Sequence, residues 1–419
     1  MKKKISYSSY LISLALFLVV IWGQTKDETL LTSVKNNAQL IPLTTLPKEQ
    51  NAFFAMLGFN ILDSTKFISE GYQSLAEATK KAQQKPLDFM QHFELPKTYD
   101  KDLFLYQLPC DINQTNQDCL NDVLAQKNII QQYLKEQYKF IDNYLVLQKY
   151  TNFAHLFPRN VNASLPLLYT SNISQLLTAK AILDIEAGKI NQGMRFILAD
   201  IQFYRNMLRS EQRSLEETNA FINALSQLYF VVDRLAHSGI NLTSYQTELT
   251  PLLAPLSKEQ RSLVWALENE RNIQLITEIA LGYQNFYTGA NEIAGCQQNS
   301  CDFSRYFSRL IYKFNATLNA IYRDWQPMID FAKQDTPLDE NFLTQLKLLQ
   351  QIELNHHSMT MLRLFERYGF FLYKNFEGEK QKNNIYYAEG YTLWFIKVYV
   401  LNNTIQQLNI ALQNSHWKN

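Results

Sequence analysis

Residues 173–237 read ISQLLTAKAILDIEAGKINQGMRFILADIQFYRNMLRSEQRSLEETNAFINALSQLYFVVDRLAH, with apolar side chains recurring every three or four positions. This spacing places them on one face of a helix, so the stretch predicts three consecutive helices joined by short turns. Two of the apolar faces consist of Met194, Ile197, Leu198, Ile201, Tyr204 and Leu208, and of Phe221, Leu225, Leu228, Val232 and Leu235. Gly188 can adopt the left-handed backbone that ends the first helix. We expect this unit to be the packing centre of the protein.

The composition favours a large helical fold. Of the 419 residues, 46% are hydrophobic, whereas the chain has 12 glycines and 11 prolines. The apolar content can build a large core, and the scarcity of turn-forming residues disfavours β-rich folds. The net charge is +1, which argues against nucleic acid as a partner because phosphate binding needs a basic face. We expect one all-α domain over residues 24–419, built as an irregular helical array or a solenoid-like stack of αα-hairpins.

Capping signals and apolar patterns predict further helices. Ser214 with Glu217, and Ser257 with Gln260, have the spacing of capping boxes that open two helices. The apolar run 51–59 is either a short helix or a buried extended segment. The irregular stretch 85–116 is favoured as a surface loop pinned by a disulfide, with a functional or lid-like loop as the alternative. Other helices are expected at 64–84, 119–150 (one long helix or two in line), 257–286, 303–314, 316–333, 340–375 and 385–412.

The N-terminus carries an export signal. Three lysines at positions 2–4 precede an apolar run over residues 5–23. A run of this length can just span a bilayer as a helix. Bulky Ile21 stands close to the best cleavage position after Gly23, which favours an uncleaved signal anchor over a cleaved signal peptide. We therefore expect a single-pass protein of the inner membrane, with residues 1–23 as the anchor and the bulk of the chain in the periplasm.

Four cysteines agree with export to an oxidising compartment. Cys110 and Cys119 are nine positions apart, and Cys296 and Cys301 are five apart. Three disulfide connectivities exist in principle, and two local pairs are the simplest. A four-thiolate metal site is the alternative, but neither pair has the two-residue gap typical of zinc ligands. We expect disulfides, with no metal or cofactor.

Glu268, Glu353 and His356 are the candidates for chemistry. Glu353 and His356 share a helical face, as in carboxylate-bridged metal sites, but the chain has no second Glu-x-x-His. A hydrogen-bonded core histidine is therefore favoured. Glu268 and Arg271 have the spacing of an ion pair on one helix, and a catalytic carboxylate would need a partner across a cleft.

The sequence lacks the repeats of a tetratricopeptide protein and the motifs of two common hydrolase classes. Ala181, Gly188 and Gly193 have the small-residue spacing of a tetratricopeptide hairpin, but no second copy follows, so an ordinary αα-hairpin is favoured. The Gly-x-Ser-x-Gly and His-Glu-x-x-His motifs are absent from the sequence.

One set of stretches comprises residues 51–59, the loop between Cys110 and Cys119, residues 181–208, residues 263–271 and the run 315–319. Together these stretches resemble a group of uncharacterised, exported, helical proteins of Gram-negative bacteria. The resemblance implies an envelope location and a helical fold, and it implies no activity.

The sequence thus favours a non-enzymatic scaffold or adaptor, tethered through residues 5–23, that binds another envelope protein, for example in a secretion or cell-wall machine. The first alternative is an envelope hydrolase acting on peptidoglycan or lipid. The second is a carrier of apolar ligands, which the 26 phenylalanines and 24 tyrosines allow.

Overall fold

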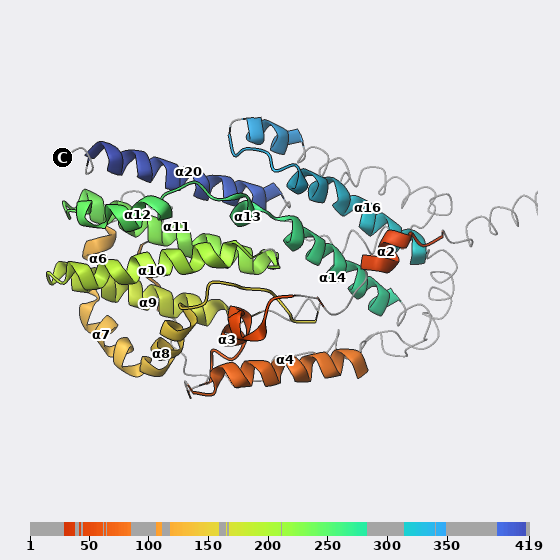
Figure 1. Ribbon diagram of the computed structural model, residues 1–419, viewed down its shortest axis with the longest axis horizontal. Coiled ribbons are helices and arrows are strands. Elements are labelled where there is room, and N and C mark those ends of the chain that lie inside the picture. Colours follow the sequence, from red (N-terminus) through yellow and green to blue (C-terminus); the bar gives the residue numbers. More distant parts are fainter. Residues whose placement is uncertain are drawn as a thin grey trace, which may run out of the picture. The chain divides into compact units, whose positions relative to one another are not determined.

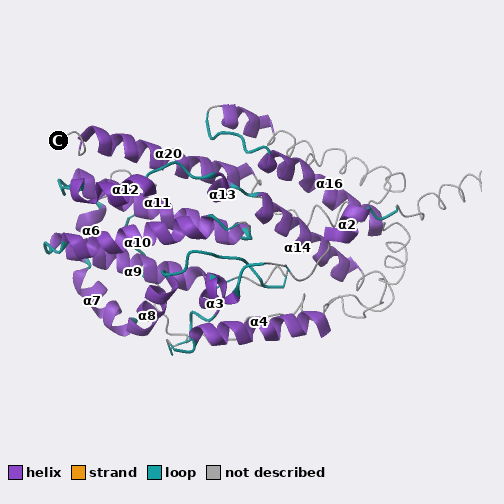
Figure 2. Ribbon diagram, viewed as in Figure 1, coloured by secondary structure: helices purple, strands orange, loops and turns teal. Residues whose placement is uncertain are grey.

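The computed structural model describes most of the chain between residues 29 and 415. The described residues are 29–84 (without 38–41, 43, 44, 62 and 64), 106–110, 118–158, 165–282 (without 166 and 211), 314–348 (without 340) and 392–415. Within these ranges the protein is helical without a strand, which confirms the predicted all-α class (Figure 2). One isolated bridge pairs Asn51 with Asn152. The solenoid-like arrangement stays a prediction.

The chain divides into two compact units. The larger comprises residues 40–270, 328–346 and 391–419, and the smaller comprises residues 1–39, 271–327 and 347–390. The expectation of one domain over 24–419 stays a prediction.

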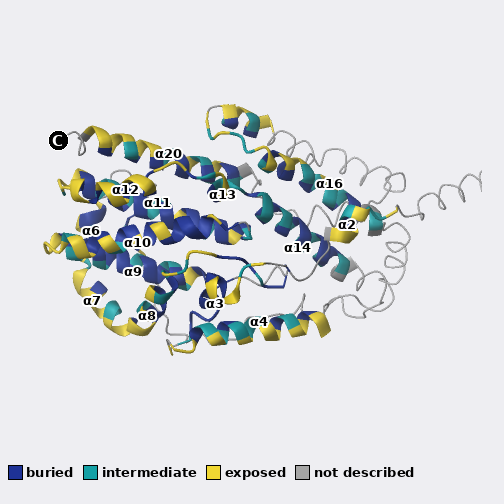
Figure 3. Ribbon diagram, viewed as in Figure 1, coloured by how far each residue is buried: buried dark blue, intermediate teal, exposed yellow. Residues whose placement is uncertain are grey.

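Three consecutive helices form the centre of the larger unit, as the sequence predicts. They are α9 (Leu167–Glu186), α10 (Ile190–Leu208) and α11 (Leu215–His237), and α10 packs against both of the others (Figure 1). Their inward faces are buried (Figure 3). The first helix begins at Leu167, a few residues before the expected start at Ile173.

The turn between α9 and α10 depends on two glycines. Gly188 has φ of +80°, which confirms the predicted left-handed end of α9. Gly193 faces α9 so closely that an added Cβ would lie 2.4 Å from the carbonyl oxygen of Ala181. The small residues in the sequence pattern therefore allow the two helices to approach closely.

Shorter helices surround this centre. Residues 119–150 are predicted to form one long helix or two in line, but they form three shorter helices. These are α6 (Cys119–Ala125), α7 (Lys127–Glu136) and α8 (Tyr138–Leu147), and all three pack against α9. Next to α10 are α12 (Gln246–Leu252), which follows the 3-10 turn η2 (Thr243–Tyr245), and α13 (Lys258–Arg261). The long helix α20 (Thr392–Ser415) packs against α11.

The apolar run 51–59 proves to be a short helix, α3 (Ala52–Leu57), which follows the 3-10 turn η1 (Lys48–Gln50). It packs against α4 (Phe67–Gln84), which begins after the expected start at 64. A Cβ on Gly71 would lie 2.1 Å from the carbonyl oxygen of Phe54, so glycine is required for this contact.

The helix predicted for 257–286 is interrupted. Ser257 and Gln260 do form a capping box, but α13 ends at Arg261 and α14 (Val264–Gly282) begins after an extended Ser262. The buried guanidinium of Arg213 donates hydrogen bonds to the carbonyl oxygens of Glu259, Gln260 and Ser262. These bonds satisfy carbonyl groups that a continuous helix would otherwise use, so a distant arginine stabilises the break.

The smaller unit contains α2 (Thr32–Asn37), the second part of α14 and most of α16 (Phe314–Lys333). The indole of Trp325 on α16 donates to Oε1 of Gln274 on α14 at 2.6 Å. Asn319 accepts from the backbone N–H of Leu31 and donates to the carbonyl oxygen of Thr29.

Among the described helices, none has both the length and the apolar character needed to cross a bilayer. The expected anchor over residues 1–23 lies outside the described residues, as do residues 303–313 of the predicted helix 303–314 and most of the one over 340–375.

Candidate functional site

A buried imidazole–carboxylate pair lies where the segment before α9 meets the start of α11. Nδ1 of His155 is 2.7 Å from Oε1 of Glu217, and both side chains are almost fully buried. Glu217 belongs to the predicted capping box, and its Oε2 accepts from the backbone N–H of Ser214 at 2.7 Å. The backbone N–H of His155 donates to the carbonyl oxygen of Gln212. One carboxylate thus caps α11 and holds the histidine.

Two more carboxyl groups interact with this pair. Burial raises the pKa of Glu270 on α14 to about 7, although the backbone of Leu215 and the charge of His155 favour the ionised form. The carboxylates of Glu216 and Glu217 raise the pKa of Glu270 further. Glu216 is exposed, and partial desolvation followed by repulsion from Glu217 raises its pKa. A carboxyl group that titrates near neutral pH beside an imidazole has the properties needed for proton transfer.

The sequence-based candidates lie elsewhere. Glu268 forms an ion pair with Lys333, with 2.9 Å between Oε1 and Nζ, and both side chains are partly exposed. The guanidinium of Arg271, the partner expected for Glu268, lies over the ring of Tyr322 at 4.5 Å. Glu353 and His356 lie outside the described residues.

Sequence reasoning did not select His155, Glu217 or Glu270. His155 stands in an extended segment without a motif, and the sequence indicates Glu217 only as part of a capping box. One signal was present: Glu270 lies within a helix that is otherwise largely apolar.

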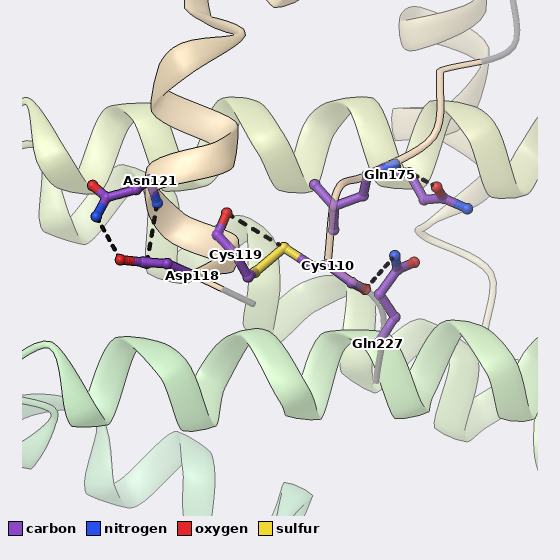
Figure 4. Close-up of a disulfide and its surroundings, with 7 residues drawn as sticks. Cys110, Asp118, Cys119, Asn121, Gln175 and Gln227 are labelled. Carbon is purple, nitrogen blue, oxygen red and sulfur yellow. Dashed lines mark hydrogen bonds between the residues drawn. A yellow bond between two sulfur atoms is a disulfide. The ribbon is translucent and has the colours of Figure 1, made fainter. Parts of the chain in front are cut away.

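The predicted disulfide between Cys110 and Cys119 is formed (Figure 4), and both cysteines are buried. The backbone N–H of Leu108 donates to Oε1 of Gln175 on α9, and Gln227 on α11 donates to the carbonyl oxygen of Cys110 (Figure 4). These two hydrogen bonds hold the segment 106–110 against two core helices, and the disulfide links this segment to the first residue of α6. The predicted pair Cys296–Cys301 lies outside the described residues.

A partly open pocket of about 250 Å³ lies between α13, the start of α14, the end of α16 and α20. Three phenylalanines, Phe331, Phe342 and Phe395, contact one another with ring centroids 5.1–6.5 Å apart. All three are almost fully buried, as are Leu263 and Val398 beside them. The pocket therefore has an apolar wall.

The opposite side of this pocket is charged. Lys258, Arg261 and Lys333 line it together with a single carboxylate, Asp335. Nη2 of Arg261 lies 2.6 Å from Oδ1 of Asp335, and Nη1 donates to the carbonyl oxygen of Thr336 at 2.9 Å. Lys258 is farther from Asp335, at 3.5 Å, and its side chain is 66% exposed. The lining thus carries an excess of positive charge.

A second, more polar groove of about 380 Å³ adjoins the segment before His155. It is lined by Thr45, Leu46, Pro47, Thr151, Asn152, Phe153, Ala154, Asn206, Arg209, Ser210 and Gln212.

Among the described residues, no group of three or more histidine, cysteine or acidic side chains has an arrangement suited to a metal ion. No protein-family model matches the chain, and no curated protein or solved structure is significantly similar to it, so the resemblance to exported helical proteins stays a prediction.

Proposed function

We propose that this protein is a non-enzymatic adaptor of the cell envelope. In this proposal residues 5–23 tether it to the inner membrane, and its periplasmic helical domain binds another envelope protein through α20. The outer face of α20 is the observation that supports the proposal best.

The outer face of α20 has the spacing of a helix-pairing seam. Its positions alternate by four and three residues, which is the repeat by which one helix packs along another. They are Ile396, Val400, Asn403, Gln407, Ile410 and Asn414. Ile396, Val400 and Ile410 are 36%, 50% and 57% exposed. Three of the six positions are apolar and the other three are amides, and exposed apolar side chains along one face of a helix are typical of interaction sites.

This face also lacks charge. The one charged residue among the 24 of α20 is Lys397, which donates to Oδ1 of Asn219 on α11. By contrast, α4 exposes Glu77, Lys80 and Lys81 to solvent. Interface cores are depleted of charged residues, so the chemistry of α20 fits a partner helix with an uncharged, partly apolar seam.

Site-specific photo-crosslinking in intact cells tests this proposal. A photoreactive amino acid at Val400 or Gln407 of the full chain should give an adduct with one envelope protein, and the same probe at Lys80 on α4 should not. Val400→Glu should abolish the adduct formed from Gln407, because a charge would be desolvated in the seam. Gln83→Glu on the exposed side of α4 is the matched control.

Three outcomes would contradict the adaptor function. They are an adduct between two copies of this chain, adducts with lipid alone, and an adduct from Gln407 that survives Val400→Glu.

The carboxyl groups around the buried His155–Glu217 pair favour a second candidate, an envelope hydrolase acting on peptidoglycan or lipid. Glu270, with its pKa of about 7, would be the proton donor in such an enzyme. The test incubates the purified full chain with peptidoglycan and with phospholipid vesicles. Hydrolysis that Glu270→Gln abolishes and Glu268→Gln leaves intact would support it, and the absence of product from both substrates would exclude it.

A further inference from the structure

The pocket between α13, α16 and α20 has one apolar wall and one positively charged wall. A simple packing defect between helices would not require this combination. One wall consists of three contacting phenylalanines with Leu263 and Val398, and the other carries lysines and an arginine. Ligand sites are typically apolar clefts in which a few polar groups fix the orientation of the bound molecule.

The charged wall is only partly neutralised within the protein. Asp335 is shared between Arg261 and Lys258, and the more distant Lys258 is mostly exposed. Nε of Arg261 is buried and has no hydrogen-bond partner among the described residues. Lys333 is half-exposed and pairs with Glu268, which is not among the residues that line the pocket. A negatively charged group at this wall would therefore meet cations that are accessible and incompletely paired.

The residue that holds Arg261 has an unusual backbone conformation. Asp335 has φ of +52°, an uncommon conformation for a residue other than glycine. Its carboxylate holds Arg261 from this strained position, and an incoming anion would compete with it for the same guanidinium.

We propose that this pocket binds a short amphiphile, with its apolar part against Phe331, Phe342 and Phe395 and its anionic head at Lys258, Arg261 and Lys333. The volume of about 250 Å³ lies just below the range of about 300–1,000 Å³ usual for drug-sized ligands, which indicates a short chain. A fatty-acid carboxylate and a lipid phosphate share this chemistry. The inference is independent of the adaptor function, because it concerns the inner side of α20.

Photoaffinity labelling of the full chain in native membranes tests the proposal. Four diazirine probes with the same octyl chain end in a carboxylate, a phosphate, an alcohol or an amine. The carboxylate or the phosphate should label residues 331–342 and 395–398, as mapped by mass spectrometry, and excess octanoate should compete. The relative yields of the two anionic probes distinguish a fatty acid from a phosphorylated lipid.

Two variants examine the two walls separately. Lys258→Gln with Lys333→Gln should lower labelling by the anionic probes about three- to tenfold and leave the alcohol unchanged, as expected for two partly exposed charges. Exposed Lys80 and Lys81 on α4, changed in the same way, are the control. Val264→Phe should fill the pocket and abolish labelling, whereas Val146→Phe on α8, also half-buried, should not.

Equal labelling by all four probes would overturn the proposal. So would labelling confined to other regions, or labelling that persists in a folded Val264→Phe variant. Thermal denaturation of each variant shows whether it is folded, and the alcohol probe gives a second readout for the lysine variant.

Discussion

The hydroxyl of Tyr144 on α8 lies 2.5 Å from Oδ1 of Asp200, a fully buried carboxyl group in the middle of α10. Gln148 donates to the same oxygen at 3.1 Å, and Ser174 on α9 donates to Oδ2 at 2.5 Å. One acidic side chain thus connects three helices of the core. Burial raises the pKa of Asp200 to about 6, although the three hydrogen bonds favour the ionised form.

The raised pKa of Asp200 predicts a pH-dependent effect of Asp200→Asn. Because the folded-state pKa of about 6 exceeds the ordinary 3.8, the folded protein binds this proton more tightly than the unfolded chain does. Ionised Asp200 therefore costs stability, and the cost grows as the pH rises from 3.8 to about 6. We expect the unfolding free energy of Asp200→Asn, relative to wild type, to increase by about 2–3 kcal/mol between about pH 4 and about pH 7. Urea denaturation at several pH values measures this.

Asp142→Asn, at an exposed position of α8, is the control and should show no such trend. If the free energy of unfolding of Asp200→Asn differs from that of wild type by a constant amount over the same pH range, the pKa of Asp200 is not raised in the folded protein. The asparagine can still accept from Tyr144, so the variant should fold.

Local signals in the sequence predict the helices better than they predict their partners. The capping boxes at Ser214 and Ser257 and the end of α9 at Gly188 depend on residues within one turn, so the sequence reveals them. The contact between Tyr144 and Asp200 joins positions 56 residues apart, and periodicity reports the buried face of a helix without its neighbour. A lone Asp200 within the apolar stripe of α10 was the available signal. For the candidate site, the pattern around Glu268 gave no indication that Glu270 would be the carboxyl near His155.

The interruption between α13 and α14 predicts a large effect of Arg213→Ala. Arg213 is 1% exposed and donates to the carbonyl oxygens of Ser210, Glu259, Gln260 and Ser262. Its removal would leave several buried acceptors unsatisfied, each costing about 1–3 kcal/mol, so we expect a loss of about 3 kcal/mol or more. Chemical denaturation measures the loss, and amide exchange should become faster in residues 257–263.

Arg209→Ala removes an exposed arginine four residues earlier and should change the unfolding free energy by less than about 0.5 kcal/mol. Equal effects of the two substitutions would show that the hydrogen bonds of Arg213 do not stabilise the interruption.

The close approach of α9 and α10 predicts that Gly193→Ala destabilises the protein. In an exposed helix this change stabilises by about 0.5–1 kcal/mol. Here the new methyl group would lie 2.4 Å from the backbone oxygen of Ala181 and 2.6 Å from Cγ1 of Ile185. Because a backbone oxygen cannot rotate away, the clash should prevail, with a net loss of about 1–3 kcal/mol. Thermal denaturation measures it, and Gln192→Ala, at the exposed neighbouring position, should have little effect. A Gly193→Ala variant as stable as wild type would exclude the close crossing.

The disulfide between Cys110 and Cys119 should contribute to stability through its effect on the unfolded chain. A loop closed over nine positions corresponds to about 2–3 kcal/mol of lost chain entropy. We therefore expect the double variant Cys110→Ala, Cys119→Ala to unfold at lower urea concentration than wild type. If the domain is exported, as proposed above, non-reducing peptide mapping of protein isolated from cells should show the two cysteines linked, because disulfides persist in an oxidising compartment. Cys296→Ala with Cys301→Ala is the matched variant, and it should leave the Cys110–Cys119 peptide intact. Free thiols at both positions in freshly isolated protein would contradict the bond and remove one support for a periplasmic location.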